Sequence, residues 1–393
     1  MNGLPGDAHV TPAARAAAAI AVLDRWLAGT PAEQALTNWG RASRFAGSGD
    51  RAAVRDLVFD AIRCRRSFAA LGGGETGRGL VLGGLRAQGA DPVALFTGEG
   101  HAPARLSGAD TGGVPQGLAA LDCPDWLEPA LQQSLGADFV PVMQALRHRA
   151  PLFLRVHAGR ASREAAMARL SSEGIETRPH TLAKFALEVI GHARKVQQSD
   201  AYASGLVEIQ DAASQAVVEA LPLSDGMRVL DLCAGGGGKT LAMAARADLT
   251  LFAHDAEPRR MADLQVRAAR AGATIAQTAA PESAAPFDLV LCDVPCSGSG
   301  SWRRSPEGKW ALTPDRLQDL LATQVMILNR AAGLVRPGGW LAYATCSLLQ
   351  AENAGQLDAF LAQRTAFVPD GGLRLTPLEG GDGFFLALLK RNG

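Results

Sequence analysis

Apolar residues recur at helical spacing along the N-terminal part of the chain. One set runs to Gly29 and consists of Ala17, Ile20, Leu23, Trp26 and Leu27. A second set follows Asp50, a residue type that can cap a helix, and consists of Val54, Leu57, Val58, Ala61 and Ile62. At least two amphipathic helices are therefore expected between about Thr11 and Leu71. Residues 72–117 are rich in Gly, Ala and Pro with weak periodicity, which predicts loops joining short helices.

The middle of the chain mixes the two periodicities. A helical pattern from Asp125 to Arg149 is followed by two strand patterns, residues 151–156 and 185–190, on either side of a helical pattern at residues 162–173. These elements predict a small α+β module.

Strand and helix patterns alternate after Met227, which is typical of a doubly wound parallel sheet. The expected strands are residues 228–232, 249–254, 274–277, 288–292 and 340–344, with helices at 257–271 and 314–335. The last apolar run, residues 384–389, is expected to add an antiparallel strand. The predicted class is α/β.

Composition narrows the function classes. With 393 residues, 47% hydrophobic and 20% charged, the chain is long enough for two or three globular domains. No apolar stretch approaches the roughly 18 residues of a membrane span, and the N-terminus lacks a basic segment with an apolar core, so we expect a cytoplasmic protein without a membrane partner. The six cysteines lack metal-ligand spacing, so neither a metal nor a disulfide framework is expected.

The charges of the chain do not point one way on whether it binds nucleic acid. The net charge is zero, which argues against a large phosphate-binding surface. Only five of the 39 basic residues are lysines. Arginine suits contact with phosphate, but a GC-rich coding genome gives the same bias and is the preferred explanation. Arg63, Arg65 and Arg66 cluster at a predicted helix end, where they would form an RNA-contacting face or simply complement the helix dipole.

A glycine-rich loop follows the first predicted strand of the parallel sheet. A phosphate-binding P-loop would need glycine at the position of Cys233, so that interpretation fails, and a dinucleotide frame is met only trivially by four consecutive glycines. The better match is the first motif of S-adenosylmethionine-dependent methyltransferases, whose loop holds the amino-acid end of the cofactor. The matching loop residues are Cys233, Ala234, Gly235, Gly236, Gly237, Gly238 and Lys239. Asp255, at the end of the next strand, would accept bonds from the ribose hydroxyls or serve as an ordinary cap.

Two cysteines follow later strands of the same sheet. Cys296 lies in Asp293-Val294-Pro295-Cys296 and Cys346 in Thr345-Cys346-Ser347. A thiol beside a cofactor loop suggests covalent attack on an electrophilic carbon. By contrast, Cys233 and Cys292 lie in or next to predicted core strands, where packing is the simpler interpretation.

Together these segments resemble the RNA cytosine-C5 methyltransferases of the RsmB/Nop2/Sun family. The resemblance covers about residues 120–391 and rests on five motifs in family order: residues 210–215, 231–240, 293–300, 344–347 with Glu352-Asn353 following, and 382–385. The helical N-terminus resembles, more loosely, the NusB-like RNA-binding domain of the RsmB branch. The resemblance implies that Cys346 adds to C6 of cytosine, Cys296 assists release, Asp293 binds the N3/N4 edge of the base beside the cofactor, and Lys239 lies near cofactor and base.

The chain departs from the family pattern at two places. Gly235-Gly236 stands where the family commonly has Ala-Pro, and Gln277-Thr278-Ala279 offers no carboxylate for the cofactor adenine. After Cys296, the segment Ser301-Trp302-Arg303-Arg304 and the pair Lys309-Trp310 would contact RNA or, equally, pack against helices.

The resemblance implies three domains: a helical NusB-like RNA-binding domain (residues 1–140), a small α+β RNA-binding module (141–205) and a Rossmann-like catalytic domain that uses S-adenosylmethionine (206–393). The expected substrate is a cytosine of 16S rRNA, and the expected oligomeric state is a monomer. A tRNA methyltransferase, a non-catalytic assembly factor and a nucleotide hydrolase remain alternatives. Two intact cysteine motifs argue against the assembly factor, and the broken P-loop frame argues against the hydrolase.

Overall fold

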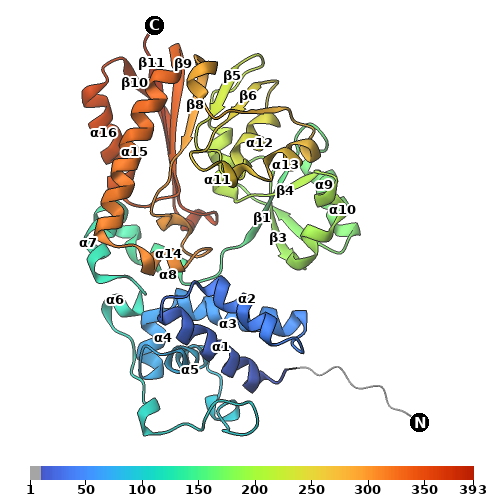
Figure 1. Ribbon diagram of the computed structural model, residues 1–393, viewed down its shortest axis with the longest axis vertical. Helices are drawn as coiled ribbons and strands as arrows, with labels where there is room; N and C mark the ends of the chain where they lie inside the picture. The colour runs from blue at the N-terminus through green and yellow to red at the C-terminus, as the bar shows by residue number, and fades with distance from the viewer. Residues whose placement is uncertain (1–9) are drawn as a thin grey trace. The chain divides into compact units, whose positions relative to one another are not determined.

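The computed structural model describes residues 10–393, which form two compact units (Figure 1). The helical unit comprises the chain through Gln132, Ala137–Arg149 and the detached segment Trp302–Ala311. The sheet unit comprises Gln133–Gly136, Ala150–Ser301 and Leu312–Gly393. Within the described part of the chain, no helix is long and apolar enough to cross a membrane.

The core of the helical unit is built from α1 (Pro12–Leu27), α2 (Ala32–Ala42), α3 (Ser48–Arg63), α4 (Arg65–Gly72) and α5 (Gly77–Ala87). Shorter helices follow at α6 (Gly117–Ala120), α7 (Glu128–Leu135) and α8 (Phe139–Leu146), and α14 (Glu307–Ala311) belongs to the detached segment. The predicted helices before Leu71 are confirmed. Asp50 is not the N-cap of α3, however, because Gly47 holds that position and Asp50 accepts a bond from the Gly47 amide at 3.1 Å.

Helix α5, of 11 residues, lies in residues 72–117, where loops joining short helices were expected. Its glycines are packing residues: a Cβ on Gly83 would lie 1.9 Å from the carbonyl oxygen of Phe68 in α4, and one on Gly79 would lie 2.1 Å from that of Gly74. Glycine therefore lets α5 approach the preceding segment closely. The same residue type that usually breaks a helix here permits close backbone packing.

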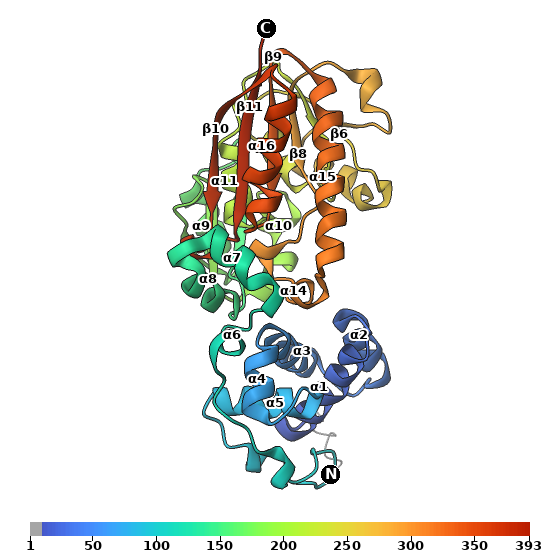
Figure 2. The same cartoon turned by 90° about the vertical axis from the view of Figure 1, so that its left-hand side faces the viewer.

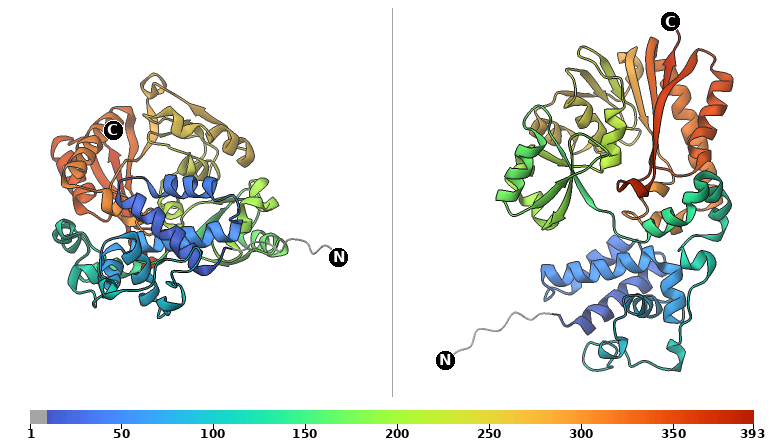
Figure 3. Two further views of the ribbon diagram at one scale, coloured as in Figure 1. Left: turned by 60° about the horizontal axis from the view of Figure 1, so that its bottom comes forward. Right: turned by 180° about the vertical axis from the view of Figure 1, so that it is seen from behind.

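A small four-stranded antiparallel sheet begins the sheet unit (Figure 3, right). Its order is β2-β3-β1-β4, from β1 (Leu152–Val156), β2 (Glu176–Pro179), β3 (Ala186–Gly191) and β4 (Val207–Ile209). Helices α9 (Arg163–Ser172) and α10 (Asp200–Ala203) contribute to its core with β1 and β3. The small α+β module is therefore present, with two short strands, β2 and β4, that the hydrophobic pattern did not predict.

The large sheet has seven strands in the order β10-β11-β9-β8-β5-β6-β7. The five strands from β9 to β7 in this order pair parallel with one another. They are β5 (Arg228–Asp231), β6 (Thr250–Ala253), β7 (Ile275–Gln277), β8 (Phe287–Asp293) and β9 (Val335–Thr345). The last two, β10 (Phe367–Leu375) and β11 (Phe384–Arg391), pair antiparallel. The predicted parallel strands and the antiparallel C-terminal strand are confirmed, and β10 is an addition.

Helices cover both faces of the large sheet, as expected of a doubly wound fold. One core contains α11 (Ala212–Glu219), α12 (Gly238–Ala244) and α13 (Leu264–Ala271). The other contains α15 (Pro314–Leu334) and α16 (Ala354–Gln363), which lie side by side in Figure 2. The helix expected at residues 257–271 is shorter, because Pro258 begins a separate 3-10 turn and α13 starts only at Leu264. The predicted fold class, α/β with a Rossmann-like domain, is confirmed.

The predicted domain limits at residues 140 and 205 remain predictions. The NusB-like character of the helical unit also remains one. The structure adds that Trp302–Ala311, which the sequence places inside the catalytic domain, packs as part of the helical unit.

Candidate active site

Two cysteine loops leave neighbouring parallel strands at the same edge of the large sheet. Asp293 at the end of β8 is level with Ala344 of β9, so Cys296 and Cys346 both lie just beyond the carboxyl ends of their strands. Their Sγ atoms are 3.5 Å apart. The structure therefore brings together the two thiols that the sequence singled out, although they are separated by 50 positions in the chain.

The two thiols differ in their electrostatics. The hydrogen bond to Cys346, followed by burial, raises the pKa of Cys296 well above its usual value. Cys296 consequently keeps its proton and can donate it in the hydrogen bond to Cys346. Because the thiolate is the nucleophilic form of cysteine, this polarity suits Cys346 as the attacking group and Cys296 as a proton-carrying partner.

Lys239 and Asp293 form an ion pair next to the thiols. Lys239, in the first turn of α12, donates from Nζ to Oδ2 of Asp293 at 2.7 Å, and its ammonium lies 4.7 Å from the centre of the Phe384 ring. Burial alone would lower the pKa of Lys239, but the attraction of Asp293 outweighs it and the pKa is raised. The lysine thus stays charged and fixes the carboxylate of Asp293.

Glu352 fastens the two cysteine loops to each other. Its fully buried carboxylate accepts the backbone amide of Ser297 at 2.8 Å and the side-chain hydroxyls of Ser297 and Ser347. Gln324 of α15 donates to the same carboxylate at 3.0 Å. Each serine directly follows one of the cysteines, so Glu352 sets their separation. The Glu352-Asn353 motif was part of the family resemblance, but nothing in its spacing revealed this clamp.

The glycine-rich loop between β5 and α12 has the backbone shape that a close-bound ligand needs. Gly235 and Gly237 have positive φ angles of +51° and +78°. A Cβ on Gly237 would lie 2.1 Å from Cδ1 of Leu264, so only glycine fits there. Gly236 is exposed, whereas Gly238 begins α12 and presents the helix N-terminus. Cys233, Ala234 and Gly238 are partly exposed in the same loop.

Side chains from several elements hold this loop. Asp255, after β6, accepts the Gly235 amide on Oδ2 at 2.9 Å and pairs with Arg260 at 3.2 Å. Arg267 donates to the Gly236 carbonyl, and Arg155 of β1 donates to the Gly238 carbonyl at 3.0 Å. The predicted role of Asp255 toward a ribose stays a prediction, because its carboxylate already braces the loop.

The polar groups around the loop fit S-adenosylmethionine. Its α-carboxylate suits the two arginines beside the glycines. A Cβ added to Gly235 would lie 3.2 Å from a guanidinium nitrogen of Arg260, and one added to Gly236 would lie 3.1 Å from a guanidinium nitrogen of Arg267. The acidic groups of Asp255 and Asp293 suit the ammonium and ribose hydroxyls. The Gln277 amide, considered for the adenine, instead reaches the Met261 carbonyl at 3.4 Å.

The other cysteines occupy packing positions. Cys292 is fully buried in β8, and burial raises its pKa well above the usual value. Burial also raises the pKa of Cys233, and those of Cys64 and Cys123 to about 11. None of these four is activated as a nucleophile, in agreement with the packing interpretation of Cys233 and Cys292.

The segment after the Cys296 loop serves packing within the helical unit. Trp302 and Lys309 are each only 1% exposed. Lys309 donates to the Arg63 carbonyl at 3.0 Å, and Trp310 donates to the Ile62 carbonyl at 2.7 Å. For Trp302 and Lys309 the helix-packing alternative holds, and the interpretation as an exposed RNA-stacking surface is wrong for these two buried side chains.

Comparisons with known proteins agree with the motifs. A family model described as "16S rRNA methyltransferase RsmB/F" matches residues 218–390, and a ferredoxin-like domain model of the RsmF/B methyltransferases matches residues 123–196. The Ribosomal RNA small subunit methyltransferase B of Xanthomonas campestris is 34% identical over 74% of this chain and 72% of that protein. Its namesake from Klebsiella pneumoniae is 35% identical over 68% of this chain.

The chain belongs to the RsmB/F family of methyltransferases. The family expected from the sequence motifs is confirmed. The chain spans 66% of the Klebsiella relative's length. The crystal structure of NSun6 from Pyrococcus horikoshii with SFG shares the fold, with a TM-score of 0.60 at 17% identity, covering 69% of this chain and 98% of that one.

Proposed function

We propose that this enzyme transfers a methyl group from S-adenosylmethionine to C5 of a cytosine in 16S rRNA, through a covalent adduct with Cys346. The observation that carries the proposal is the pair of thiols 3.5 Å apart, beside the Lys239–Asp293 ion pair and one strand away from the glycine-rich loop. A binding or assembly factor would need no such arrangement.

In the proposed reaction, the Cys346 thiolate forms a bond to C6 of the cytosine. The electron pair of the C5–C6 double bond moves onto C5 and the base ring, where Asp293 binds the N3/N4 edge and Lys239 holds that carboxylate in place. C5 then takes the methyl group. Finally, the C5 proton leaves to a base, the S–C6 bond breaks, and the double bond and the Cys346 thiolate are restored.

Cys296 is proposed to act in that last step. Its thiol lies within hydrogen-bond reach of Cys346 and holds its proton tightly, so it stabilises the Cys346 thiolate both before attack and when it leaves. As in the family implied by the sequence motifs, Cys296 therefore assists release. Removing it should leave attack possible and slow the collapse of the adduct.

The proposed cofactor site is the glycine-rich loop with Asp255 and Asp293 beside it. When bound, S-adenosylmethionine would supply the methyl group from its sulfonium, whose S–CH3 bond breaks so that the sulfur leaves as the neutral thioether of S-adenosylhomocysteine. The loop residues would bind its amino-acid end, and the ion pair would separate cofactor from base. The NSun6 structure with SFG, a methyl-donor analogue, supports this choice of cofactor.

The proposed RNA substrate rests on the names of the two bacterial relatives, which both refer to ribosomal RNA of the small subunit. Such a reaction would take place in the cytoplasm. A cytosine can reach a thiol only when it is single-stranded or turned out of its helix. Transfer RNA, the close alternative from the sequence, is separated by the test below.

The test is transfer of labelled methyl groups to unmodified small-subunit rRNA and, separately, to bulk tRNA, by the wild type, Cys346→Ala and Cys296→Ala. We expect label in rRNA as 5-methylcytosine, a loss of about 10³-fold or more in Cys346→Ala, and a stable protein–RNA adduct in Cys296→Ala. Cys64→Ala is the matched control, because Cys64 is a buried thiol of the helical unit.

Label in tRNA instead would replace the proposed substrate. Undiminished transfer by Cys346→Ala would contradict the mechanism. Failure of the wild type to bind S-adenosylmethionine would overturn the assignment of the cofactor.

A further inference from the structure

The arginines that the sequence suggested as an RNA-contacting face are engaged inside the helical unit. Arg63 donates to the carbonyl of Arg303 at 2.8 Å and pairs with Asp60. Arg65 pairs with Glu75 and lies 5.3 Å from each of two tryptophan rings. Arg66 pairs with Asp125. All three guanidinium groups therefore already have partners within the helical unit.

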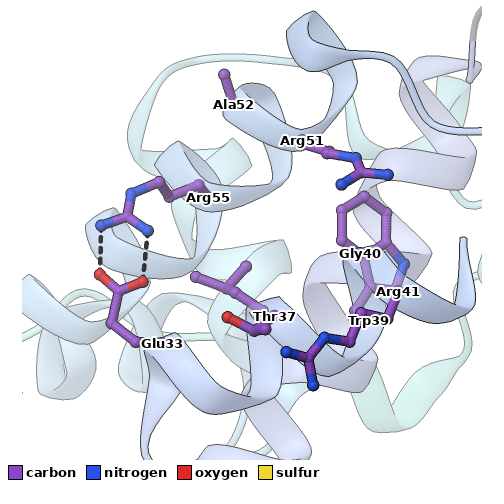
Figure 4. A pocket seen from close by; sticks show the side chains of 9 residues that line it. Glu33, Thr37, Trp39, Gly40, Arg41, Arg51, Ala52 and Arg55 are labelled. Atoms are coloured by element: carbon purple, nitrogen blue, oxygen red, sulfur yellow. Dashed lines mark hydrogen bonds and ion pairs between the residues drawn. The ribbon is translucent and has the colours of Figure 1, made fainter. Parts of the chain in front are cut away.

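A different basic surface lies between α2 and α3. The two helices line an open groove of about 430 Å³, which we call the α2–α3 groove. Its lining residues are Glu33, Leu36, Thr37, Trp39, Gly40, Arg41, Arg51, Ala52 and Arg55. Figure 4 looks into it, with Arg51 and Arg55 of α3 facing Glu33 and Trp39 of α2. Its volume lies in the range of about 300–1,000 Å³ of small-ligand sites, enough for about one nucleotide.

The charges of the groove are unequal. Arg55 is already paired with Glu33 through both nitrogens. Arg41, exposed in the last turn of α2, makes no ion pair or side-chain hydrogen bond within residues 10–393. Arg51 uses only Nε, which donates to the Ala46 carbonyl at 3.0 Å, so its two terminal nitrogens remain available. With three arginines and one glutamate, the lining carries a net charge of +2.

Aromatic surface accompanies these charges. Trp39 lines the groove and is half-buried. Phe45, in the turn that joins α2 to α3, is 68% exposed and follows the exposed Arg44. Phe45 is not among the residues that line the groove, but the turn that carries it connects the two helices that do. Guanidinium groups alternating with aromatic rings are the combination that binds single-stranded nucleic acid, by phosphate pairing and base stacking.

We propose that the α2–α3 groove binds a single-stranded segment of the RNA substrate, with phosphates on Arg41 and Arg51 and a base stacked on Trp39, and that the strand continues past the groove to Phe45. The proposal deepens the proposed function, on which it rests for the identity of RNA as the partner. The groove would hold RNA without taking part in the chemistry.

The experiment measures binding of a fluorescein-labelled 12-nucleotide polyuridine to the full chain by anisotropy, across a salt series. The variants are Arg41→Glu and the double variant Arg41→Ala/Arg51→Ala. Arg25→Glu is the matched control, because Arg25 is also an exposed arginine without a side-chain partner in the last turn of a helix, α1. Arg41→Glu removes no hydrogen bond or ion pair of the described residues, and the control places the same charge in the last turn of a helix, so both variants carry the same small cost to helix stability.

We expect the affinity of both groove variants to fall at least about tenfold, while Arg25→Glu binds like the wild type. Losing two phosphate contacts should also reduce the slope of log K against log salt by about 1.4, since each contact to a single strand contributes about 0.7. Unchanged affinity and slope in Arg41→Glu would overturn the proposal. Equal displacement of the RNA by an acidic polyglutamate peptide would also overturn it, in favour of a protein partner.

A second readout separates this proposal from the catalytic one. In methyl transfer to rRNA, the double variant should raise KM with kcat unchanged, because the groove contributes binding only. If the wild type transfers no methyl group, the catalytic proposal fails while the anisotropy result still decides the role of the groove.

Discussion

Substituting Glu352 by Gln should loosen both cysteine loops while leaving the fold intact. In the wild type, one carboxylate oxygen accepts the Ser297 amide and the Gln324 side chain, and the other accepts the hydroxyls of Ser297 and Ser347. Glutamine keeps the first acceptor. It replaces the second acceptor by an NH2 group, which is a donor. The hydroxyls of Ser297 and Ser347 would have to rotate so that their oxygens accept hydrogen bonds from this group.

The magnitude follows from the change in hydrogen-bond type. Two bonds to a charged acceptor, each worth about 1.5–3 kcal/mol, become two neutral bonds worth about 0.5–1.5 kcal/mol. The free energy of unfolding should therefore fall by about 2 kcal/mol. Because misplacing a reacting group by about 1 Å costs about 10²-fold, we expect the rate of methyl transfer to fall between about 10-fold and 100-fold.

The assay is single-turnover methyl transfer, combined with urea unfolding and S-adenosylmethionine binding. Glu379→Gln is the matched control, since Glu379 also accepts a backbone amide and a hydroxyl, both from Thr376, in an exposed turn. Cofactor affinity should be unchanged in both variants, because the glycine-rich loop makes no contact with Glu352 among the bonds described above. A wild-type rate in Glu352→Gln would refute the clamp.

Three further perturbations test other parts of the structure. Gly237→Ala would place a Cβ 2.1 Å from Leu264, so it should destabilise the fold by about 1–3 kcal/mol and weaken S-adenosylmethionine binding; unchanged urea unfolding and equilibrium dialysis would contradict the steric argument. Hydrogen peroxide should oxidise Cys296 and Cys346, whose Sγ atoms are 3.5 Å apart, to a disulfide with release of water. The enzyme should then lose activity, dithiothreitol should restore it, and mass spectrometry should locate the disulfide. A disulfide between other cysteines would contradict this prediction. Burial lowers the pKa of Lys309 to about 8, so as the pH rises the folded state loses this proton before the unfolded state does. Between pH 7.5 and 9.5 the free energy of unfolding of the wild type should therefore rise by about 2 kcal/mol relative to that of Lys309→Met. Urea midpoints that change with pH in the same way in both proteins would exclude this linkage.

The sequence predicted the elements whose signal is local. Strands β5, β8 and β9 are buried apolar runs, and the loops that follow them carry the glycines and cysteines directly in the sequence. These loops meet at one edge of the sheet because the carboxyl ends of parallel strands lie at the same edge, and the alternating strand and helix pattern already predicted a parallel sheet. Strand β10 escaped prediction because its surface is mostly exposed and it contains Pro369 and two glycines, which are weak strand formers.

The parts that could not be predicted depend on long-range packing. The burial of Lys309 becomes intelligible only once its ammonium is seen bonded to the Arg63 carbonyl, 246 positions away in the chain. The same holds for Gly83 and for Glu352, whose roles come from a carbonyl of α4 and from two loop serines. Residue type and spacing carry no record of such partners.

Strand order explains why the chemistry is assembled where it is. Strands β6, β5, β8 and β9 are consecutive neighbours, and their carboxyl ends provide Asp255, the glycine-rich loop with Lys239, Asp293, and Cys346 in that order. Most groups proposed for the cofactor therefore follow β5 and β6, Asp293 at the end of β8 lies between cofactor and base, and the two thiols follow β8 and β9. The Lys239–Asp293 ion pair joins the two halves, because its lysine follows β5 and its carboxylate ends β8. The lysine is buried and the carboxylate is partly exposed, so this pair ties the proposed methyl-donor side to the proposed acceptor side, and the proposed geometry of transfer depends on the order of the strands.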